Sequence, residues 1–575
     1  MVQGFAITHG RERESSVLEF VDVLIVGAGP VGMTLAMDLS RRGLKPLLIE
    51  TRDRDAPPSL KCNHISARTM ETFRFLGIVA DVRNAGLPEE YPHDVAFRTS
   101  FLGSELARIP IPCRRDRYSV AEGPDCNWPT PEPPHRLNQS YLEPILAHHL
   151  TNTFAVESRY GTTFRHLVQD EDGVTVTLHD GARGEHQVRC RYLIGCDGPR
   201  SSVREQIGAQ LRGDAVVLRV QSSYIRAPEL LPSLLTKGLK PAWGTLSLNP
   251  RRSGTVYAID GQDRWLVFNY LRDDEADFES VDRDWAIRQI LGVTRDFPYQ
   301  LVSKQDWVGR RLIASHFRKE RVFICGDAAH IWVPFAGYGM NAGIADAMNL
   351  SWLLWAHLSG WAPVAILDAY EAERYSITEQ VSHFAMKHSS SVAGHRKIVP
   401  AEIEDNGDVG VRARADLGRS VYELNVQQYC CAGLNFGYFY GKSPIIAHDG
   451  NEAAPLYSMG EYTPSTVPGC RTPHFWLRDG RSLYDVFGLG YTLLRFDRTV
   501  DVDTLISVAQ ARNVPLTVLD LDLEKDRVAD LYRHKLVLSR PDQHVAWRGD
   551  DLPQDPTDLV ELIRGAGSQS EQRAA

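Results

Sequence analysis

Residues 21–50, VDVLIVGAGPVGMTLAMDLSRRGLKPLLIE, decide the fold that the sequence predicts. An apolar run is followed by a glycine turn, an amphipathic segment and a second apolar run. This pattern is typical of a strand–helix–strand unit in a buried parallel sheet. The turn carries Gly27, Gly29 and Gly32 with the spacing GxGxxG. The stretch therefore predicts a Rossmann-like α/β layer that binds a dinucleotide.

Each glycine of this turn has its own role in the prediction. Gly27 permits the tight turn, Gly29 lets the backbone approach a pyrophosphate, and Gly32 lets helix and strand pack closely. Pro30 stands at the start of the helix, whose free N–H groups attract phosphates. Glu50 ends the next strand and can accept hydrogen bonds from ribose hydroxyls. The alternative is a glycine turn that serves packing alone.

A second motif separates FAD from a nicotinamide cofactor. In RVFICGDAAH, residues 321–330, an apolar strand ends at Gly326 and Asp327. A carboxylate at a strand end suits a ribitol hydroxyl, and the glycines that follow let backbone N–H groups lie against a flat ring. A surface aspartate in a loop is the other interpretation. The cofactor-binding residues predicted after this strand are Gly326, Asp327, Pro334, Gly337, Gly339, Met340 and Asn341.

Composition narrows the class of protein. The 575 residues predict roughly three or four domains, and 43% hydrophobic with 24% charged residues is ordinary for a globular chain. A net charge of -9 argues against nucleic acid as a partner. The nine cysteines have no CxxC or metal-type spacing, so we expect neither a disulfide framework nor a metal site. We find no signal peptide or apolar membrane span, and expect a cytoplasmic protein.

Changes of pattern along the chain suggest five regions. Strand-like alternation, rich in aromatic and β-branched residues, fills residues 211–308 and should form one wall of a pocket. The expected regions are a flexible leader (1–19), a FAD-binding domain (20–210 and 309–400), an inserted substrate-binding sheet domain (211–308), a linker (401–469) and a small α/β domain (470–575).

Several motifs together resemble one family. The stretch GDAAHIWVPFAGYGMNAGIADAMNL resembles the second flavin fingerprint of the class A flavoprotein aromatic hydroxylases. Asp197 and Gly198, in YLIGCDGPRSSVRE, are similar to that family's middle motif, which is implicated in FAD and NAD(P)H binding. Gln139, in PHRLNQSYLEPIL, and Arg68, in ARTMETFRFLG, match positions that the family places near the flavin.

The resemblance extends to the end of the chain. Residues 433–446, 473–488 and 536–549 are similar to the phenol-hydroxylase branch, which ends in a thioredoxin-like domain. The implied fold is α/β: a Rossmann-like FAD-binding domain, an inserted mixed β-sheet substrate domain and a C-terminal thioredoxin-like α/β domain. Without a CxxC pair, that last domain is expected to serve structure or dimerisation.

The same resemblance implies an activity. We expect an FAD-dependent monooxygenase that hydroxylates a small phenolic compound with NADPH or NADH and O2, through a flavin C4a-hydroperoxide, as a homodimer without a membrane partner. The alternatives are an epoxidase, a hydroxylase of polycyclic natural products, and a non-catalytic FAD-binding protein. A halogenase is disfavoured because the chain has no WxWxIP segment.

The catalytic base is where the chain departs from its family. Related phenol-type hydroxylases carry Asp or His at the position of Asn63, and an asparagine cannot take a proton from a phenol. The candidates are the neighbouring His64 and Tyr224 on the predicted sheet, although either could serve packing alone. Asn63 remains a hydrogen-bond partner for a substrate oxygen. Pro334 is expected to shape the loop beside the flavin, and His330 to support that loop.

Overall fold

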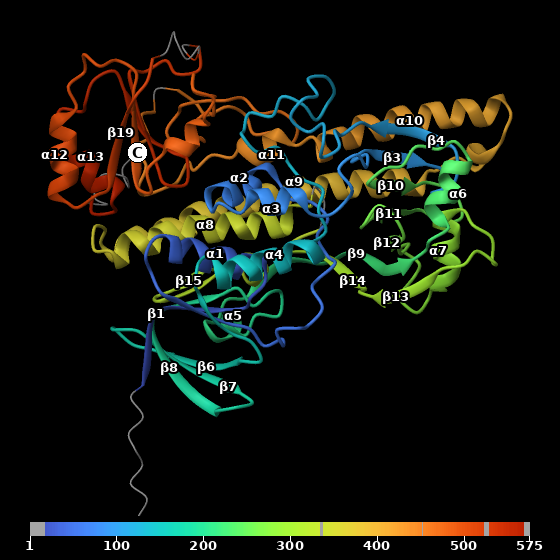
Figure 1. Cartoon of the computed structure of the whole chain (residues 1–575), viewed down its shortest axis with the longest axis horizontal. Helices are drawn as coiled ribbons and strands as arrows, with labels where there is room; N and C mark the ends of the chain where they lie inside the picture. Colours follow the sequence, from blue (N-terminus) through green and yellow to red (C-terminus); the bar gives the residue numbers. More distant parts are fainter. Residues whose placement is uncertain (1–17, 334–336, 451, 523–527, 529, 568–575) are drawn as a thin grey trace, which may run out of the picture.

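The computed structural model describes residues 18–333, 337–450, 452–522, 528 and 530–567. It has three β-sheets with helices packed between and around them, which confirms the predicted α/β class. Figure 1 shows the small C-terminal domain at one end, in orange and red, and a largely green sheet at the other. The predicted leader lies outside the described residues up to position 17, and Pro334 also lies outside them.

The first sheet has eight strands and is parallel at its centre. Strand β1 (Glu19–Val26) pairs in parallel with β2 (Pro46–Ile49) and with β8 (Gly184–Gly195). Strand β16 (Val322–Ile324) pairs in parallel with β8. The remaining strands are β5 (Glu157–Arg159), β6 (Thr163–Gln169), β7 (Val174–Asp180) and β15 (Arg318–Lys319).

The registers bring the carboxyl ends of four parallel strands to one edge of this sheet. Val26 pairs with Ile49 on one side and with Gly195 on the other, and Gly195 pairs with Ile324. Ligands of open α/β sheets bind at such an edge. The predicted cofactor motifs therefore converge because each one directly follows one of these strand ends.

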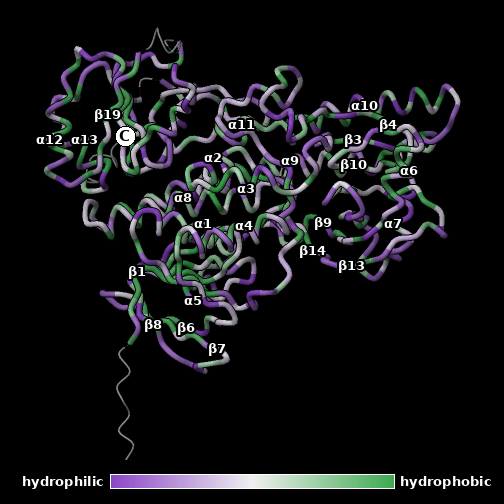
Figure 2. Tube along the Cα trace, in the orientation of Figure 1, coloured by the Kyte–Doolittle hydropathy of each residue, from purple (hydrophilic) through white to green (hydrophobic). Residues whose placement is uncertain are grey.

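Helices cover this sheet and bury its apolar residues. Helix α1 (Pro30–Arg41) packs against α8 (Tyr338–Leu358) and α4 (Gln139–Asn152). Strand β1 ends in four fully or nearly fully buried apolar residues, and Figure 2 shows hydrophobic residues concentrated around β1 and these helices. The other helices of this part are α2 (Ala67–Phe75), α3 (Val79–Asn84) and α5 (Ser202–Gln206).

The second sheet has nine strands and includes more of the chain than predicted. Its long strand β9 (Leu211–Arg226) lies between β12 (Arg264–Tyr270) and β14 (Trp307–Ala314). Strands β3 (Val95–Arg98) and β4 (Glu105–Ile109) also belong to it, although the sequence assigned them to the FAD-binding domain. The remaining elements are β10 (Gly244–Ser247), β11 (Gly254–Ala258), β13 (Gln300–Lys304), β17 (His330–Ile331), α6 (Leu230–Thr236) and α7 (Arg283–Leu291).

The predicted linker is wrong over much of its length. Residues expected to connect two domains form the 22-residue helix α10 (Asp408–Tyr429), which packs on β4 and on α9 (Asp368–Lys397). Its charged residues lie largely on the exposed face, while Leu417 and Val421 are buried against the second sheet. Helix α10 thus closes the sheet domain, and the short α11 (Ala432–Phe436) follows it.

The C-terminal domain is a four-stranded sheet with two helices. Strand β18 (Tyr491–Arg495) lies between a parallel β19 (Leu516–Asp520) and an antiparallel β20 (Leu536–Ser539), and β21 (Val545–Gly549) extends the sheet. Its helices are α12 (Asp503–Ala511) and α13 (Pro556–Ile563). Over the described residues, no helix combines the length and apolar character needed to cross a bilayer.

Candidate active site

The first glycine turn has the geometry that a dinucleotide requires. Gly27 has φ +106°, and a Cβ there would lie 2.4 Å from the carbonyl oxygen of Cys196. A Cβ at Gly32 would lie 2.0 Å from the carbonyl oxygen of Gly27. Gly29, by contrast, has no atom within 4 Å of its Cβ position. Two glycines are fixed by packing, and the third leaves open space that a phosphate can enter.

Glu50 holds this turn in place. Its Oε2 accepts a hydrogen bond from the Ala28 N–H at 2.8 Å, and its Oε1 accepts one from the Arg52 N–H at 2.9 Å. Both Glu50 and the turn line the same cavity. The residue therefore has a structural role in addition to the predicted one of binding a ribose hydroxyl.

Two aspartates at neighbouring strand ends face this cavity. Asp197 follows β8, and its Oδ2 accepts from the Val203 N–H at 3.2 Å. Asp327 follows β16 and is exposed to the cavity while protein surrounds it. Burial raises the pKa of both carboxyl groups; nearby His330 and Lys61 oppose the rise at Asp327. Gly326 does not line the cavity: it packs against Val31 and Gly343.

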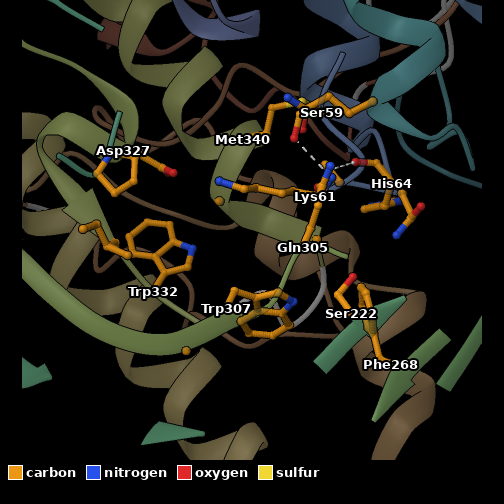
Figure 3. A pocket seen from close by; sticks show the side chains of 18 of the residues that line it. Ser59, Lys61, His64, Ser222, Phe268, Gln305, Trp307, Asp327, Trp332 and Met340 are labelled. Atoms are coloured by element: carbon orange, nitrogen blue, oxygen red, sulfur yellow. Dashed lines mark hydrogen bonds between the residues drawn. The ribbon is translucent and has the colours of Figure 1, made fainter. Parts of the chain in front are cut away.

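One cavity of about 1010 Å³ joins the two sheets. Figure 3 shows Asp327, Lys61 and Met340 on one side and Ser222, Phe268 and Trp307 on the other. A volume of this size is in the range of sites for cofactors and small molecules. The predicted site residues that line it are Gly27, Gly29, Pro30, Glu50, Asn63, His64, Gln139, Asp197, Gly198, Asp327, Gly337, Gly339 and Met340.

The far side of the cavity is lined by a continuous row of aromatic rings. Trp307, Phe268, Tyr257, Trp243 and Tyr429, here called the aromatic wall, follow one another with ring centroids 4.9–6.2 Å apart. The first three come from strands of the second sheet, Trp243 directly precedes β10, and Tyr429 ends α10. The expectation that this sheet forms a pocket wall is met.

Tyr224 does not belong to this wall. It lies on β9 two residues beyond Ser222, packs beside Leu266 in a small apolar cluster, and does not line the cavity. Burial raises its pKa above the ordinary value, so it holds its proton more firmly than a free tyrosine. The assignment of Tyr224 as a base is therefore wrong in this geometry.

His64 lines the cavity, but its contacts do not suit a base. The Arg136 guanidinium donates a hydrogen bond to Nδ1, which places the ring proton on Nε2. Burial, followed by the charge of Arg136, lowers the pKa of His64 well below 6.5. His64 is thus a neutral imidazole whose Nε2–H is a donor. The proton-accepting role that the sequence suggested is wrong in this geometry.

Asn63 is held as a hydrogen-bonding side chain beside His64. Its Oδ1 accepts from Asn138 Nδ2 at 2.5 Å, and the side chain lines the cavity. With its oxygen engaged, its amide group remains to donate to a ligand. This geometry fits the predicted contact to a substrate oxygen.

Arg68 and Asn341 lie outside the cavity. The Arg68 guanidinium contacts Glu71, Gln543 and the carbonyl of Asp542, so it ties α2 to the C-terminal domain instead of facing a flavin. Asn341 binds the backbone of Ser66 and His64 across α8 and α2. Both were predicted to contact the cofactor; Asn341 instead fixes the chain that carries His64.

His330 has the supporting role that the sequence suggested. Its Nε2 lies 2.6 Å from Asp346 Oδ2, which also accepts from the Gly326 N–H at 3.2 Å. The other oxygen of Asp346 accepts from Arg374 Nε at 2.7 Å. This buried network stabilises the turn that carries Asp327.

Two features of the cavity were missed from the sequence. Tyr429 and Arg396 line it, yet they stand in segments assigned to a linker and to the FAD-binding domain. Neither segment carries a local motif. Only the tertiary packing of α9 and α10 over the second sheet brings them to the site.

Two segments of the chain match known families. The family described as FAD binding domain matches residues 20–385, and the family described as aromatic-ring hydroxylase, C-terminal, matches residues 465–566. The chain belongs to the phenol-hydroxylase-like family of FAD-dependent aromatic hydroxylases. The predicted family, the cofactor FAD and the monooxygenase activity on aromatic compounds, which uses NAD(P)H and O2, are thereby confirmed.

Relatives and solved structures agree over nearly the full length. Phenol 2-monooxygenase of Pseudomonas sp. (strain EST1001) is 30% identical over 96% of this chain and 93% of its own. The rebeccamycin biosynthetic enzyme RebC with reduced flavin is 31% identical, with a TM-score of 0.86 over 96% of this chain and 100% of its own. Aklavinone-11 hydroxylase, solved with FAD and aklavinone, is 28% identical, with a TM-score of 0.76 over 94% and 98%.

The residues present fit this cofactor. The open space at Gly29 suits the pyrophosphate, and Glu50 and Asp327 can accept from ribose and ribitol hydroxyls. Gly337 and Gly339 line the same cavity, next to His64 and Trp332 respectively. When bound, FAD supplies the redox chemistry that activates O2. The cavity's lining of aromatic and apolar side chains is suited to orient a substrate ring and to exclude water from it.

Proposed function

We propose that the chain hydroxylates a phenolic substrate whose ring lies against the aromatic wall. The observation that carries the proposal is the placement of this wall across one cavity from Asp327 and the glycines of the flavin fingerprint. Flat apolar side chains bind an aromatic ring by stacking and by excluding water. The substrate's hydroxyl would face the donors of Asn63 and His64.

The reaction proceeds in this proposal without a protein side chain as base. Asn63 cannot accept a proton, His64 is a neutral donor, and Tyr224 lies outside the cavity. The Arg136 guanidinium stands beside His64, and a nearby cation stabilises the anionic form of a phenol. Arg136 would therefore lower the pKa of the bound phenol and make its ring more nucleophilic.

A polycyclic substrate is the second candidate. The aromatic wall extends over five side chains, and the cavity continues to Val392 and Val421 on α9 and α10. A single phenol ring covers only part of such a surface. The solved complex of aklavinone-11 hydroxylase with aklavinone, and a relative named as a putative polyketide hydroxylase, support this second candidate.

Three further proposals concern the whole chain. The strand order β19-β18-β20-β21, with β18 and β19 parallel around α12, supports a thioredoxin-like C-terminal domain. All nine cysteines are free, which supports a cytoplasmic location. We retain the homodimer as a proposal that depends on the family resemblance.

The test is NAD(P)H consumption by the FAD-loaded enzyme with phenol, 2-naphthol and larger hydroxylated polycyclic compounds. Product and H2O2 are measured together, with NADH and NADPH compared. Substrate-stimulated oxidation with a product one oxygen heavier supports the proposal, and the best substrate distinguishes one ring from several. If no aromatic compound stimulates oxidation above the rate without substrate, the proposed function is wrong.

A further inference from the structure

Arg396 is a cation that faces the substrate end of the cavity without an acidic partner. It stands in the last turn of α9, and its guanidinium lies 3.8 Å from the centre of the Tyr270 ring. Over the residues that the structure describes, no carboxylate forms an ion pair with it. Its partial exposure is to the cavity, while protein surrounds the group closely.

An uncompensated guanidinium in such a place needs an explanation. Removing a charge from water is costly unless a partner of opposite charge compensates it. A cation–π contact with Tyr270 recovers only part of that cost. Burial accordingly lowers the pKa of Arg396 below its ordinary value, and Tyr270 is the one group that opposes the decrease.

A role at the end of the helix does not explain the residue. Cations in the last turn interact favourably with the helix dipole. Lys397, the next residue, already supplies such a cation from an exposed position and pairs with Asp273 at 2.6 Å. Arg396 instead turns toward the cavity, where the dipole alone does not require a second cation.

A second cation gives the same end of the cavity an excess of positive charge. Arg136 is buried, donates to His64 and to the Tyr429 carbonyl, and lies 4.8 Å from the Trp243 ring. It too has no ion pair with any described carboxylate. The carboxylates that line the cavity lie at its cofactor end or are paired with arginines; they are Glu50, Glu143, Asp197, Asp306 and Asp327.

We infer that Arg396 binds an anionic group of the substrate, and that the preferred substrates are aromatic compounds that carry a carboxylate. The guanidinium presents several donors in one plane and matches a carboxylate in a two-point contact. The inference rests on the proposed function, because it takes the cavity as the aromatic binding site. Arg396 determines specificity in this role and takes no part in the chemistry.

The test compares two naphthalenes that differ in charge, 3-hydroxy-2-naphthoate and 2-naphthol. Their affinity for the FAD-loaded enzyme is measured from the change in flavin absorbance and from the shift in melting temperature. The wild type should bind the carboxylate at least about tenfold more tightly than the naphthol, as expected for a hydrogen bond between charged groups. Arg396→Gln should lose this preference without weaker binding of 2-naphthol.

Two further variants separate charge from folding. Arg396→Lys keeps the charge but not the planar group, and should keep part of the preference. Lys397→Gln removes the neighbouring exposed cation and should bind both compounds as the wild type does. Retained FAD in each purified variant shows that the fold is intact.

The result that overturns the inference is a wild type that binds the two naphthalenes equally or binds neither. A preference that survives in Arg396→Gln overturns it as well. Failure of the proposed function looks different: the carboxylate binds through Arg396, yet no compound is hydroxylated. Hydroxylation of neutral phenols without a charge preference would leave the function standing and remove the anion site.

Discussion

Arginines that protein surrounds have carboxylate partners in one region of this molecule and none in another. Where the C-terminal domain meets α9, the fully buried Arg540 contacts Glu373 at 2.8 Å and Asp542 at 2.7 Å. Where the same domain meets α2, Arg471 pairs with Glu71; the contacts with α9 and α2 together are here called the domain interface. In the substrate cavity, by contrast, Arg136 and Arg396 have no carboxylate partner among the described residues.

The difference shows which charges serve the fold and which remain for a ligand. Burial alone lowers the pKa of Arg540, but Asp542 and Glu373 raise it well above its ordinary value. For Arg396 burial dominates, and its pKa decreases. In the domain interface, carboxylates of the protein itself compensate the charge of the arginine. In the cavity, the charge of Arg396 is compensated only when an anionic ligand binds, as we propose.

Glu373→Gln would remove one of the two carboxylates that pair with Arg540, so that this arginine becomes more like the unpaired arginines of the cavity. Glu373 accepts from Arg540, Ser443 and Asn349, so the substitution leaves a buried guanidinium with one acid instead of two. Breaking a buried pair in this way costs about 3–5 kcal/mol. We expect a clearly lower denaturant midpoint for the C-terminal domain and faster proteolysis at its junction with α9.

The matched control uses the same helix. Glu379 pairs with Arg311 at 2.7 Å but is 39% exposed, and solvent-exposed pairs contribute at most about 1 kcal/mol. Glu379→Gln should therefore shift the midpoint little. Equal shifts for the two variants would show that the domain interface does not depend on the compensation of Arg540.

Much of the fold could be predicted because its signals are local. The strand–turn–helix–strand pattern of residues 21–50 identified β1, α1 and β2, since buried parallel strands are apolar throughout and the glycines mark the turn. The helix α10 was missed because its charged exposed face resembles a loop. Strands β3 and β4 were assigned to the wrong layer because they join the second sheet through a distant partner: β4 pairs with β3, and Val95 of β3 pairs with Gly244 of β10.

Asp327→Ala tests whether the unpaired carboxylate at the cofactor end of the cavity binds FAD. Asp327 has no ion pair among the described groups and is exposed to the cavity, which suggests that it is kept for FAD. Loss of one charged hydrogen bond should cost about 1.5–3 kcal/mol, or roughly 10–150-fold in the Kd for FAD. The measurement is flavin fluorescence on titration of the apoprotein.

The melting temperature of the FAD-free protein is the control for an effect of the substitution on the fold. If Asp327 serves the ligand alone, the FAD-free variant should melt at the temperature of the FAD-free wild type. The surface substitution Asp273→Ala removes only an exposed ion pair with Lys397. It should leave the Kd for FAD unchanged and lower the melting temperature little, because exposed pairs contribute little to stability. Full FAD occupancy in purified Asp327→Ala would refute the assigned role.

The site was predictable only in its cofactor half. Gly27, Gly29, Glu50 and Asp327 belong to strand ends, where one motif fixes both position and chemistry. The substrate half is assembled from a distant sheet and two helices, so Arg396 and Tyr429 gave no signal. The base candidates failed for a related reason: the contact between Arg136 and His64 joins residues 72 positions apart.

Among these variants, Arg136→Met should change stability least, in contrast to Glu373→Gln. It removes hydrogen bonds to His64 and Tyr429 but also removes an uncompensated cation, so the two changes oppose each other. We expect stability to change by less than about 1 kcal/mol. The pKa of His64 should rise without the cation, and burial should keep it below 6.5.

Histidine titration by NMR of isotope-labelled protein measures that change. Because the folded-state pKa of His64 is lowered, stability decreases as pH falls below about 6.5, toward the folded pKa. A higher folded pKa in Arg136→Met narrows this interval, so the variant should lose less stability in acid than the wild type. His474, held at a pKa of about 3 by burial and by Arg471, is the internal reference and should not move. An unchanged His64 would mean that Arg136 does not govern its protonation, and the phenolate-stabilising role proposed for Arg136 would lose its support.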